Sequence, residues 1–440
     1  MIKNVISNKL FTLQFYRDIR KYNCPDNSQI GLGVNHTPPF HGINTLLQNI
    51  LVHLFKTNNV AYYPRPGGEA DERKALSGLL NLYLGSPIFK PEHIIVTNGS
   101  SEGIDIVCKF AAKRGLSALL PLPAYFQYEY AAVENNLPLN GYYNTIGETF
   151  WTNQDELPLV FFINSPDAIT GKFQSLAFFE QIKNDSGNNI GFMLFDLCYQ
   201  MMDIDPNVNS QKLASQIATD ADWSNSAMLL TASKDISLPA LRSGLIVSKN
   251  IELLSVAKDT IMKRYFSVSP ICYYLMLIYL ALAILFRTET EELAIMFTRI
   301  QSIFAQCNLY LPDFTIELVN EFRQTHCQML EHFKQNLNYL LFDFHDIFDI
   351  NSSIQPQAGF SCFLKLRNHI KLSAVKKMAH ILSKEYKLNV YPSYTFCGTP
   401  HIWETLYPQE VHLRVNISPQ HEQIFHSMNK LRKGLKKFAM

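Results

Sequence analysis

The chain has 440 residues, of which 47% are hydrophobic and 12% aromatic. This length suits two or three cooperating subdomains, and the apolar content supports a large buried core and argues against disorder. The 39 basic and 38 acidic residues nearly cancel, and no stretch is basic enough to predict a nucleic-acid partner.

The spacing of cysteines and histidines predicts neither a disulfide framework nor a metal site. The eight cysteines are scattered and form no C-x-x-C pair. The histidines offer no H-E-x-x-H, and His421 and His426 have the wrong helical offset to place two ligands on one face. Since the N-terminus lacks the apolar core and cleavage site of a signal peptide, we predict a cytoplasmic protein.

Between about residues 90 and 250, short apolar runs alternate with helical patterns. The runs are HIIVT (93–97), LVFFI (159–163), IGFMLF (190–195), MLLTA (228–232) and GLIVS (244–248). All are apolar on both faces, as strands of a covered, mostly parallel sheet must be. After the first run, Ile104, Val107, Cys108 and Ala111 follow the 3.6-residue period of a helix. The pattern predicts an α/β sheet domain.

The segment PICYYLMLIYLALAILF (270–286) raises the question of a membrane span. It is uncharged, but its length lies at the bottom of the spanning range. It also carries two adjacent tyrosines and stands alone in the chain. We therefore predict a buried core or interface helix and no membrane partner.

The last part of the chain shows a different pattern. A long charged helical stretch (287–345) comes first. It is followed by GFSCFLKL (359–366), a helix (372–387), the strand-like KLNVY (387–391), HLRVNIS (412–418) and a basic helix. The first 45 residues read as an arm that joins this part. We predict a large domain over 46–305 and a smaller α+β domain built from both chain ends, 1–45 and 306–440.

A glycine-containing turn follows the first strand run. VTNGSSEGID (96–105) reads as a strand, a turn and a helix start, which points free N–H groups and the helix dipole at one spot. Ser100 and Ser101 add hydroxyl donors. The motif is suited to an anion, although an ordinary turn and N-cap explains the same residues.

Asp196 ends the most apolar strand, in FDLCYQ (195–200). A carboxylate in that position is costly to bury unless a cation meets it. A protonated pyridine nitrogen would be such a cation, and Asp196 would keep that ring able to withdraw electrons. Tyr199 could donate a hydrogen bond to an oxygen on the same ring. A helix-capping aspartate is the alternative interpretation.

The segment TASKDISLPALRSG (231–244) brings a hydroxyl, a lysine and an arginine together before a strand. Lys234 stands at a strand end in an apolar setting, where its charged form is disfavoured. The neutral amine is the form that makes a Schiff base. Arg242 could supply a forked, permanent charge to a phosphate. A solvated surface lysine is the alternative.

Taken together, these segments resemble the class I/II aminotransferases, the fold-type I family of pyridoxal-phosphate (PLP) enzymes. The similarity runs from about Gly33 to Asn416. Seven motifs come in the family's order: YPRPGGEADERKAL (63–76), TNGSSEG (97–103), PAYFQY (123–128), NSPDAITGK (164–172), DLCY (196–199), SK-x7-R-x-G (233–244) and LRVN (413–416). Any one motif is weak, whereas seven in order make the resemblance strong.

The resemblance implies a fold-type I PLP-transferase fold, a homodimer and PLP as cofactor. Lys234 would hold PLP as the internal aldimine and then move a proton between the substrate α-carbon and the cofactor. Asp196 would pair with the pyridine nitrogen and Tyr199 with the ring hydroxyl oxygen. Tyr125 would stack on the ring face.

The resemblance also implies phosphate and substrate contacts. The phosphate would be cradled by Gly99, Ser100, Ser101, Thr231 and Arg242. Tyr63 would reach the same phosphate from the neighbouring subunit, and Asn164 is counted among the cofactor-binding residues. Arg414 would grip the substrate α-carboxylate in a bidentate pair, helped by backbone near Gly33.

The sequence departs from the family pattern in the loop that the family writes N-P-x-N-P-T-G. Ala168 replaces the second asparagine, whose amide would donate to the ring hydroxyl oxygen, and Ile169 replaces the proline after it. Ala240 stands where a glycine usually precedes the phosphate arginine. Either Tyr199 and a water suffice for the oxygen, or the chain has drifted toward another chemistry at the α-carbon.

Two enzyme functions therefore stay open. The first is amino transfer between an α-amino acid and a 2-oxo acid. The alternative is a PLP-dependent lyase, cyclase or β/γ-replacement enzyme on the same fold, in which a side-chain group is expelled. A non-catalytic regulator of this fold is disfavoured by the full set of lysine, aspartate, tyrosine and arginine.

Overall fold

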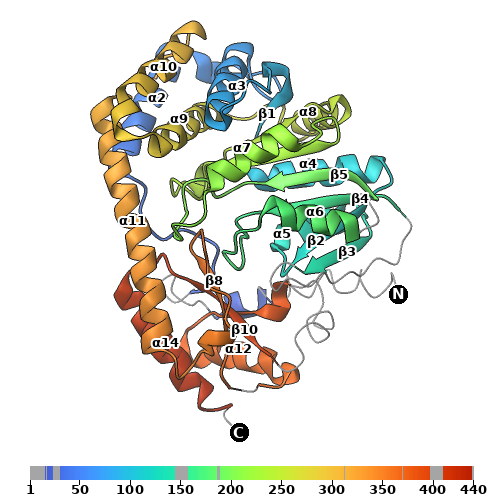
Figure 1. Cartoon of the computed structure of the whole chain (residues 1–440), viewed down its shortest axis with the longest axis vertical. Coiled ribbons are helices and arrows are strands. Elements are labelled where there is room, and N and C mark those ends of the chain that lie inside the picture. Colours follow the sequence, from blue (N-terminus) through green and yellow to red (C-terminus); the bar gives the residue numbers. More distant parts are fainter. Residues whose placement is uncertain are drawn as a thin grey trace.

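The computed structural model describes residues 15, 17–22, 30–143, 157–185, 189–311, 313–368, 370–396 and 410–438. Much of the predicted N-terminal arm, namely residues 1–14, 16 and 23–29, lies outside this part of the chain. A seven-stranded sheet forms the centre of the molecule, in the order β1-β7-β6-β5-β4-β2-β3 (Figure 1). Its strands are β1 (Ile94–Thr97), β2 (Ser117–Leu122), β3 (Leu139–Tyr143), β4 (Leu159–Asn164), β5 (Ile190–Asp196), β6 (Ser226–Thr231) and β7 (Gly244–Ser248).

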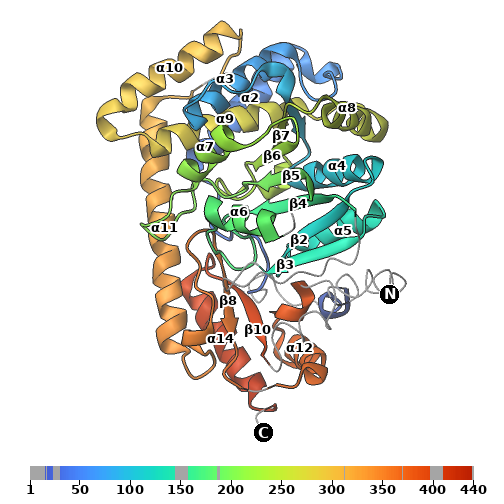
Figure 2. The ribbon, with the colours of Figure 1, turned by 45° about the vertical axis from the view of Figure 1, so that its right-hand side comes forward.

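Most neighbours in this sheet run parallel. The pairs from β3 through β2, β4, β5 and β6 are all parallel, and β7 runs antiparallel to both β6 and β1. β1, β2, β4, β6 and β7 are buried along their whole length, because helices cover the sheet (Figures 1 and 2). The predicted α/β class and mostly parallel sheet are confirmed.

The helices of the first part are α2 (His41–Lys56), α3 (Ala70–Leu84), α4 (Ser100–Lys113), α5 (Phe126–Glu134), α6 (Leu176–Asp185), α7 (Ser210–Asp220), α8 (Ile251–Tyr265), α9 (Pro270–Arg287) and α10 (Leu293–Gln306). They are followed by α11 (Ile316–Asp343), α12 (Leu372–Tyr386) and α14 (His421–Leu435). A second, three-stranded antiparallel sheet has the order β8-β10-β9, with β8 (Ser361–Lys365), β9 (Tyr391–Pro392) and β10 (His412–Asn416).

The buried apolar residues form two clusters. The first runs from Phe40 to Phe322 and surrounds the large sheet. The second joins Phe15, Ile19 and Ile30 to residues of β8, β10, α12 and α14. α11 passes from the first cluster into the second and spans the molecule along one side (Figure 1).

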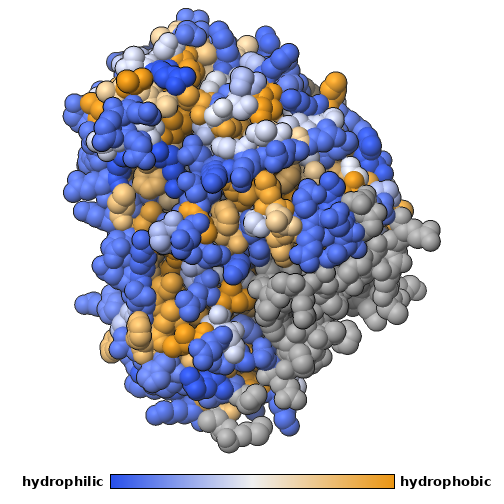
Figure 3. Space-filling model, in the orientation of Figure 1, coloured by the Kyte–Doolittle hydropathy of each residue, from blue (hydrophilic) through white to orange (hydrophobic). Residues whose placement is uncertain are grey.

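The apolar helix α9 lies inside the first cluster. It is long and apolar enough to cross a membrane by length and composition, yet its residues 272–285 are all buried among neighbouring helices. It packs against α3 and α2, and its last residue, Arg287, is the first charge after the apolar run. On the face seen in Figure 3, hydrophilic side chains predominate and apolar ones are mostly set between them.

Three details of the sequence prediction were wrong. The helical stretch 287–345 is two helices, α10 and α11, separated by residues 307–315. The run 387–391 is not a strand, because Lys387 adopts a left-handed conformation (φ +52°) that caps α12, and only Tyr391 enters β9. Two strands, β2 and β3, were missing from the predicted sheet.

Candidate active site

Several predicted site residues lie at the carboxyl ends of the strands, along one edge of the sheet. Asn164, Asp196 and Thr231 are the last residues of β4, β5 and β6, and the first two lie opposite each other in register. Thr97, the last residue of β1, reaches the same edge beside Gly244. Ligands of open α/β sheets bind at this carboxyl edge.

Lys234 lies in the loop that follows β6 and is partly buried. Its Nζ donates a hydrogen bond to the Gly33 carbonyl oxygen at 2.6 Å, and its own carbonyl accepts one from Asn35 Nδ2 at 3.4 Å. Burial, together with the positive charge of Arg414, lowers the pKa of Lys234 from its ordinary value to about 8. A substantial share of this amine is therefore neutral near physiological pH, which suits a nucleophile.

Asp196 is buried with a donor on each carboxylate oxygen. Tyr128 donates its hydroxyl to Oδ2 at 2.6 Å, and the Cys198 thiol contacts Oδ1. Burial raises the pKa of Asp196, while the hydrogen bonds from Cys198 and Tyr128 and the charge of Lys234 oppose that rise. The site thus holds a buried carboxylate that interacts electrostatically with Lys234 and that a cationic partner would stabilise.

Tyr199 and Tyr125 bring two aromatic rings to this edge. Tyr199 is buried and packs edge-to-face on Phe360, with ring centroids 5.7 Å apart. Tyr125 precedes α5, and its hydroxyl forms a hydrogen bond with Ser101. Burial raises the pKa of both phenols, so both remain neutral hydrogen-bond donors at physiological pH.

The turn between β1 and α4 forms a cradle beside Arg242. Gly99 has φ +78°, a conformation that L side chains rarely adopt, so a substitution here would strain the backbone; a Cβ on it would also stand 2.8 Å from Arg242 Nη2. Arg242 donates to the Asn98 carbonyl at 3.3 Å. Ser100 and Ser101 open α4, whose first N–H groups point out of the helix end.

Thr231 also lies at this cradle, but its hydroxyl is engaged within the protein. It donates to the Ser243 carbonyl at 2.6 Å and lies 2.9 Å from the Ser233 hydroxyl. Gly244 completes the packing, because a Cβ there would lie within 3.0 Å of Gly99 and Ser100 backbone atoms.

Arg414 lies in β10 and brings the second sheet to the site. It is only 6% exposed, and its guanidinium donates to Ser361 Oγ at 3.0 and 3.2 Å and to the Ala168 carbonyl at 2.9 Å. Gly33 lies so close that a Cβ on it would be 2.4 Å from Arg414 Nη2. The bare backbone of Gly33 therefore sits between Lys234 and Arg414.

The Asn164 side chain forms hydrogen bonds with backbone groups of Asp196 and Ala168. Asn164 Nδ2 donates to the Asp196 carbonyl at 3.1 Å, and its Oδ1 accepts the Ala168 N–H at 2.8 Å. The amide of Asn164 therefore supports the ends of β4 and β5, and the Ala168 carbonyl in turn holds Arg414.

Tyr63 lies apart from these contacts within the chain. Its side chain is 77% exposed, and its ring lies 5.4 Å from that of Phe266. The remaining predicted site residues converge, and the structure adds Tyr128, Cys198 and Ser361. Of these, Tyr128 had a sequence signal, because it follows Tyr125 at helical spacing in the PAYFQY motif.

The fold is that of the fold-type I PLP-transferases, and comparison with known proteins gives the family. The model of the aminotransferase class I and II family matches residues 27–431. The chain belongs to this family, as the seven motifs predicted.

Curated relatives match only in part. A probable aminotransferase of Arabidopsis thaliana is 28% identical over 99 residues, which are 22% of this chain and 22% of the relative. A histidinol-phosphate aminotransferase of Anoxybacillus flavithermus is 23% identical over 220 residues, or 49% of this chain and 54% of the relative. The chain thus spans about a fifth and about half of the length of these two relatives.

Solved structures share the fold over almost the full length. Aspartate aminotransferase of Thermotoga maritima has a TM-score of 0.65 at 14% identity, covering 93% of this chain and 92% of that one. Aromatic aminotransferase of Pyrococcus horikoshii has a TM-score of 0.67 at 15% identity, covering 95% and 98%. At this identity the likeness concerns the fold.

Proposed function

We propose that the protein is a PLP-dependent aminotransferase that exchanges the amino group of an α-amino acid for the oxo group of a 2-oxo acid in the cytoplasm. One observation carries the proposal. The low-pKa amine of Lys234 is close enough to a buried carboxylate, Asp196, and a buried guanidinium, Arg414, for both charges to affect its pKa. An amine, a carboxylate and a guanidinium together match a cofactor with a cationic ring and a substrate with a carboxylate.

The residues present fit PLP. When bound, PLP supplies an aldehyde that condenses with amines with loss of water, and a ring that withdraws electrons from the neighbouring carbon. Asp196 would hold the proton on the ring nitrogen, and Tyr199 would donate to the ring oxygen. The glycine turn at Gly99, the N-terminal end of α4 and Arg242 form an anion cradle for the phosphate.

Lys234 is the residue that would transfer the proton. The neutral amine of Lys234 would act as a base that takes the α-proton of the amino acid and returns it on the cofactor side. Arg414 would hold the α-carboxylate through two parallel N–H donors and so orient the α-carbon toward Lys234. No net oxidation occurs over the full cycle of two half-reactions.

An amino-acid panel tests this function. Purified holoenzyme is mixed with single amino acids while the visible absorption band is recorded, and a 2-oxo acid is then added. We expect loss of the band with a reactive amino acid and its return with the 2-oxo acid. A protein that releases ammonia or product and keeps its band without any acceptor would contradict amino transfer.

A lyase, cyclase or β/γ-replacement activity on the same fold is the second candidate. The observation that favours it is Ala168, a residue beside the site that offers no side-chain donor. The distinction appears in the same panel, because such an enzyme forms product from a substrate with a side-chain leaving group and needs no 2-oxo acid.

The lowered pKa of Lys234 predicts how the cofactor attaches. Because only the neutral amine attacks the aldehyde, the rate at which apoprotein gains its visible band should rise with pH through a midpoint near 8. Stopped-flow mixing of apoprotein with PLP measures this rate. Arg414→Met should move the midpoint upward, since the Arg414 charge lowers the Lys234 pKa. A midpoint near 10 in the wild-type protein would refute the prediction.

We also propose a homodimer in which Tyr63 reaches the phosphate of the other subunit. Tyr62 and Tyr63 are 72% and 77% exposed, and Phe55 and Phe266 add exposed apolar surface. Burial of such side chains favours association. Tyr63→Phe should weaken PLP retention by about 0.5–1.5 kcal/mol, the value of one hydrogen bond, as measured by dialysis. Tyr62→Phe is the matched control. A fully active monomer in sedimentation would contradict the shared site.

A further inference from the structure

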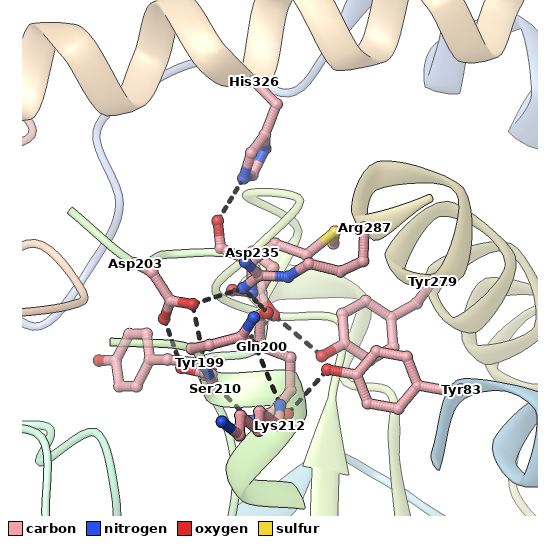
Figure 4. A network of polar contacts seen from close by, with 12 residues as sticks. Tyr83, Tyr199, Gln200, Asp203, Ser210, Lys212, Asp235, Tyr279, Arg287 and His326 are labelled. Carbon is pink, nitrogen blue, oxygen red and sulfur yellow. Dashed lines mark hydrogen bonds and ion pairs between the residues drawn. The ribbon is translucent and has the colours of Figure 1, made fainter. Parts of the chain in front are cut away.

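Asp235, the residue that follows Lys234 in the sequence, is a buried carboxylate within a network of polar contacts (Figure 4). Asp235 is 1% exposed and accepts three hydrogen bonds. Two come from the backbone N–H groups of Gln200 at 2.9 Å and Met201 at 3.2 Å, and the third comes from the Tyr279 hydroxyl at 2.9 Å. Gln200 and Met201 are the two residues after Tyr199, and Asp235 follows Lys234, so these hydrogen bonds join the Tyr199 loop to the Lys234 loop.

The Gln200 side chain holds Tyr199 itself. Its Nε2 donates to the Tyr199 carbonyl at 2.9 Å, and its Oε1 accepts the Tyr83 hydroxyl at 2.9 Å. The Gln200 carbonyl accepts from Arg287, the residue that ends the apolar helix α9. Every polar group of Gln200 is thus engaged, so the backbone after Tyr199 has little freedom.

The same loop is anchored from two further helices. Arg287 pairs with Asp203 at 2.7 Å, and Asp203 accepts the N–H of Ser210 at the start of α7. His326 on α11 donates from Nε2 to the Met201 carbonyl at 2.7 Å. Burial lowers the pKa of His326 to about 4, so this imidazole is neutral and its Nε2 carries the proton.

The charge of Asp235 distinguishes it from an ordinary core residue. Its burial raises its pKa to about 6, against the hydrogen bonds from Gln200 and Tyr279. At neutral pH the group is ionised, the form that can accept all three hydrogen bonds. Burying such a charge is costly, and the three donors that offset this cost all lie beside Tyr199 or on α9.

We propose that Asp235 is a positioning residue that fixes Tyr199 relative to Lys234 through the N–H groups of Gln200 and Met201. The two functional side chains belong to loops that follow different strands, β5 and β6. Asp235 joins those loops one residue from each side chain. This inference rests on the proposed function, because its consequence is the distance between Tyr199 and the ring oxygen of the cofactor.

Asp235→Asn tests the proposal in the full-length holoenzyme. Asparagine keeps the shape but replaces one acceptor oxygen by an NH₂ group, which faces donors and cannot accept from them. We expect the pH midpoint of the visible cofactor band to rise by about 0.5–1 pH unit, the equivalent of one weakened hydrogen bond at the ring oxygen. Tyr199→Phe should raise the same midpoint directly.

The double variant decides between positioning and general stability. If Asp235 acts through Tyr199, Asp235→Asn adds no further shift in a Tyr199→Phe background. Additive shifts, or an unchanged midpoint with only a lower Tm, would overturn the proposal. Asp105→Asn is the control, since Asp105 is a part-buried carboxylate that pairs with Lys109 on α4 and with Arg264 on α8. It should leave the midpoint unchanged.

A milder variant keeps the test decisive if Asp235→Asn fails to fold. Tyr279→Phe removes one donor and leaves the charge and both backbone contacts in place. We expect a smaller shift in the same direction, again absent in the Tyr199→Phe background. A lower Tm with no shift would refute the positioning role. A wild-type protein without any visible band would instead refute the proposed function.

Discussion

Replacing Lys234 by alanine is expected to abolish the covalent link to PLP and to lower kcat by roughly three orders of magnitude or more. The first loss follows because Lys234 supplies the partly neutral amine of the site. The second follows because general acid–base catalysis by a positioned side chain contributes about 10²–10⁴-fold. Borohydride reduction and peptide mapping measure the link, and single-turnover kinetics measure the rate.

The control for this variant is Lys249→Ala. Lys249 is an exposed lysine after β7, and its removal should leave both the trapped adduct and kcat unchanged. The Lys234→Ala protein should still bind PLP without a covalent bond, because the cradle at Gly99 and Arg242 is intact. A reduced adduct on another lysine of the wild-type protein would end the assignment.

Arg414→Ala is expected to lower kcat/KM by roughly two to four orders of magnitude for substrates that carry an α-carboxylate. This factor corresponds to a loss of about 3–5 kcal/mol of transition-state stabilisation. Arg414 is buried, so water cannot replace its two donors when the substrate carboxylate binds. The loss should appear mainly in KM for the carboxylate substrate. Steady-state kinetics over a series of amino acids and matching amines measure it.

Arg414→Lys provides the matched comparison. Lysine keeps the charge but lacks the planar fork, so it should recover only part of the affinity. PLP binding should be unchanged in both variants, because neither contacts the phosphate cradle. If the wild-type protein prefers amines without an α-carboxylate, Arg414 does not hold the substrate in the proposed way.

The strands that carry the site could be predicted from the sequence because they are continuous apolar runs. β4, β5 and β6 need cover on both faces, and this shows directly in their composition. β2 and β3 were missed because Pro121 and Gly141 lie inside them, and both residues argue against a strand interior. β2 nevertheless lies between two parallel neighbours, so tertiary packing overrode the local preference.

The chemistry-bearing residues could be predicted where a strand end or a turn fixes their position. Asp196, Thr231 and the glycine turn at Gly99 are of this kind. The partners of those residues could not be predicted in the same way. The contact of Arg414 with the Ala168 carbonyl joins positions 246 residues apart, and the hydrogen bond from Asn35 to the Lys234 carbonyl joins positions 199 apart. Such contacts depend on how whole elements pack.

The hydrogen bonds between residues 30–34 and Asn416 have a consequence for the order of folding. The Asn416 side chain donates to the carbonyls of Leu32 and Val34, which lie 384 and 382 positions earlier, and its N–H donates to Ile30. The entropic cost of closing a loop grows with its length, so we expect these contacts to form late in folding.

The first core, by contrast, draws on residues from Phe40 to Phe322 and can assemble while the rest of the chain is still being synthesised. Gly33, which touches both Lys234 and Arg414, reaches its place only when these long-range contacts form. We therefore expect competence to react with PLP to appear at the end of refolding, after most secondary structure has formed. A segment that precedes the first core in the sequence thus completes the proposed site.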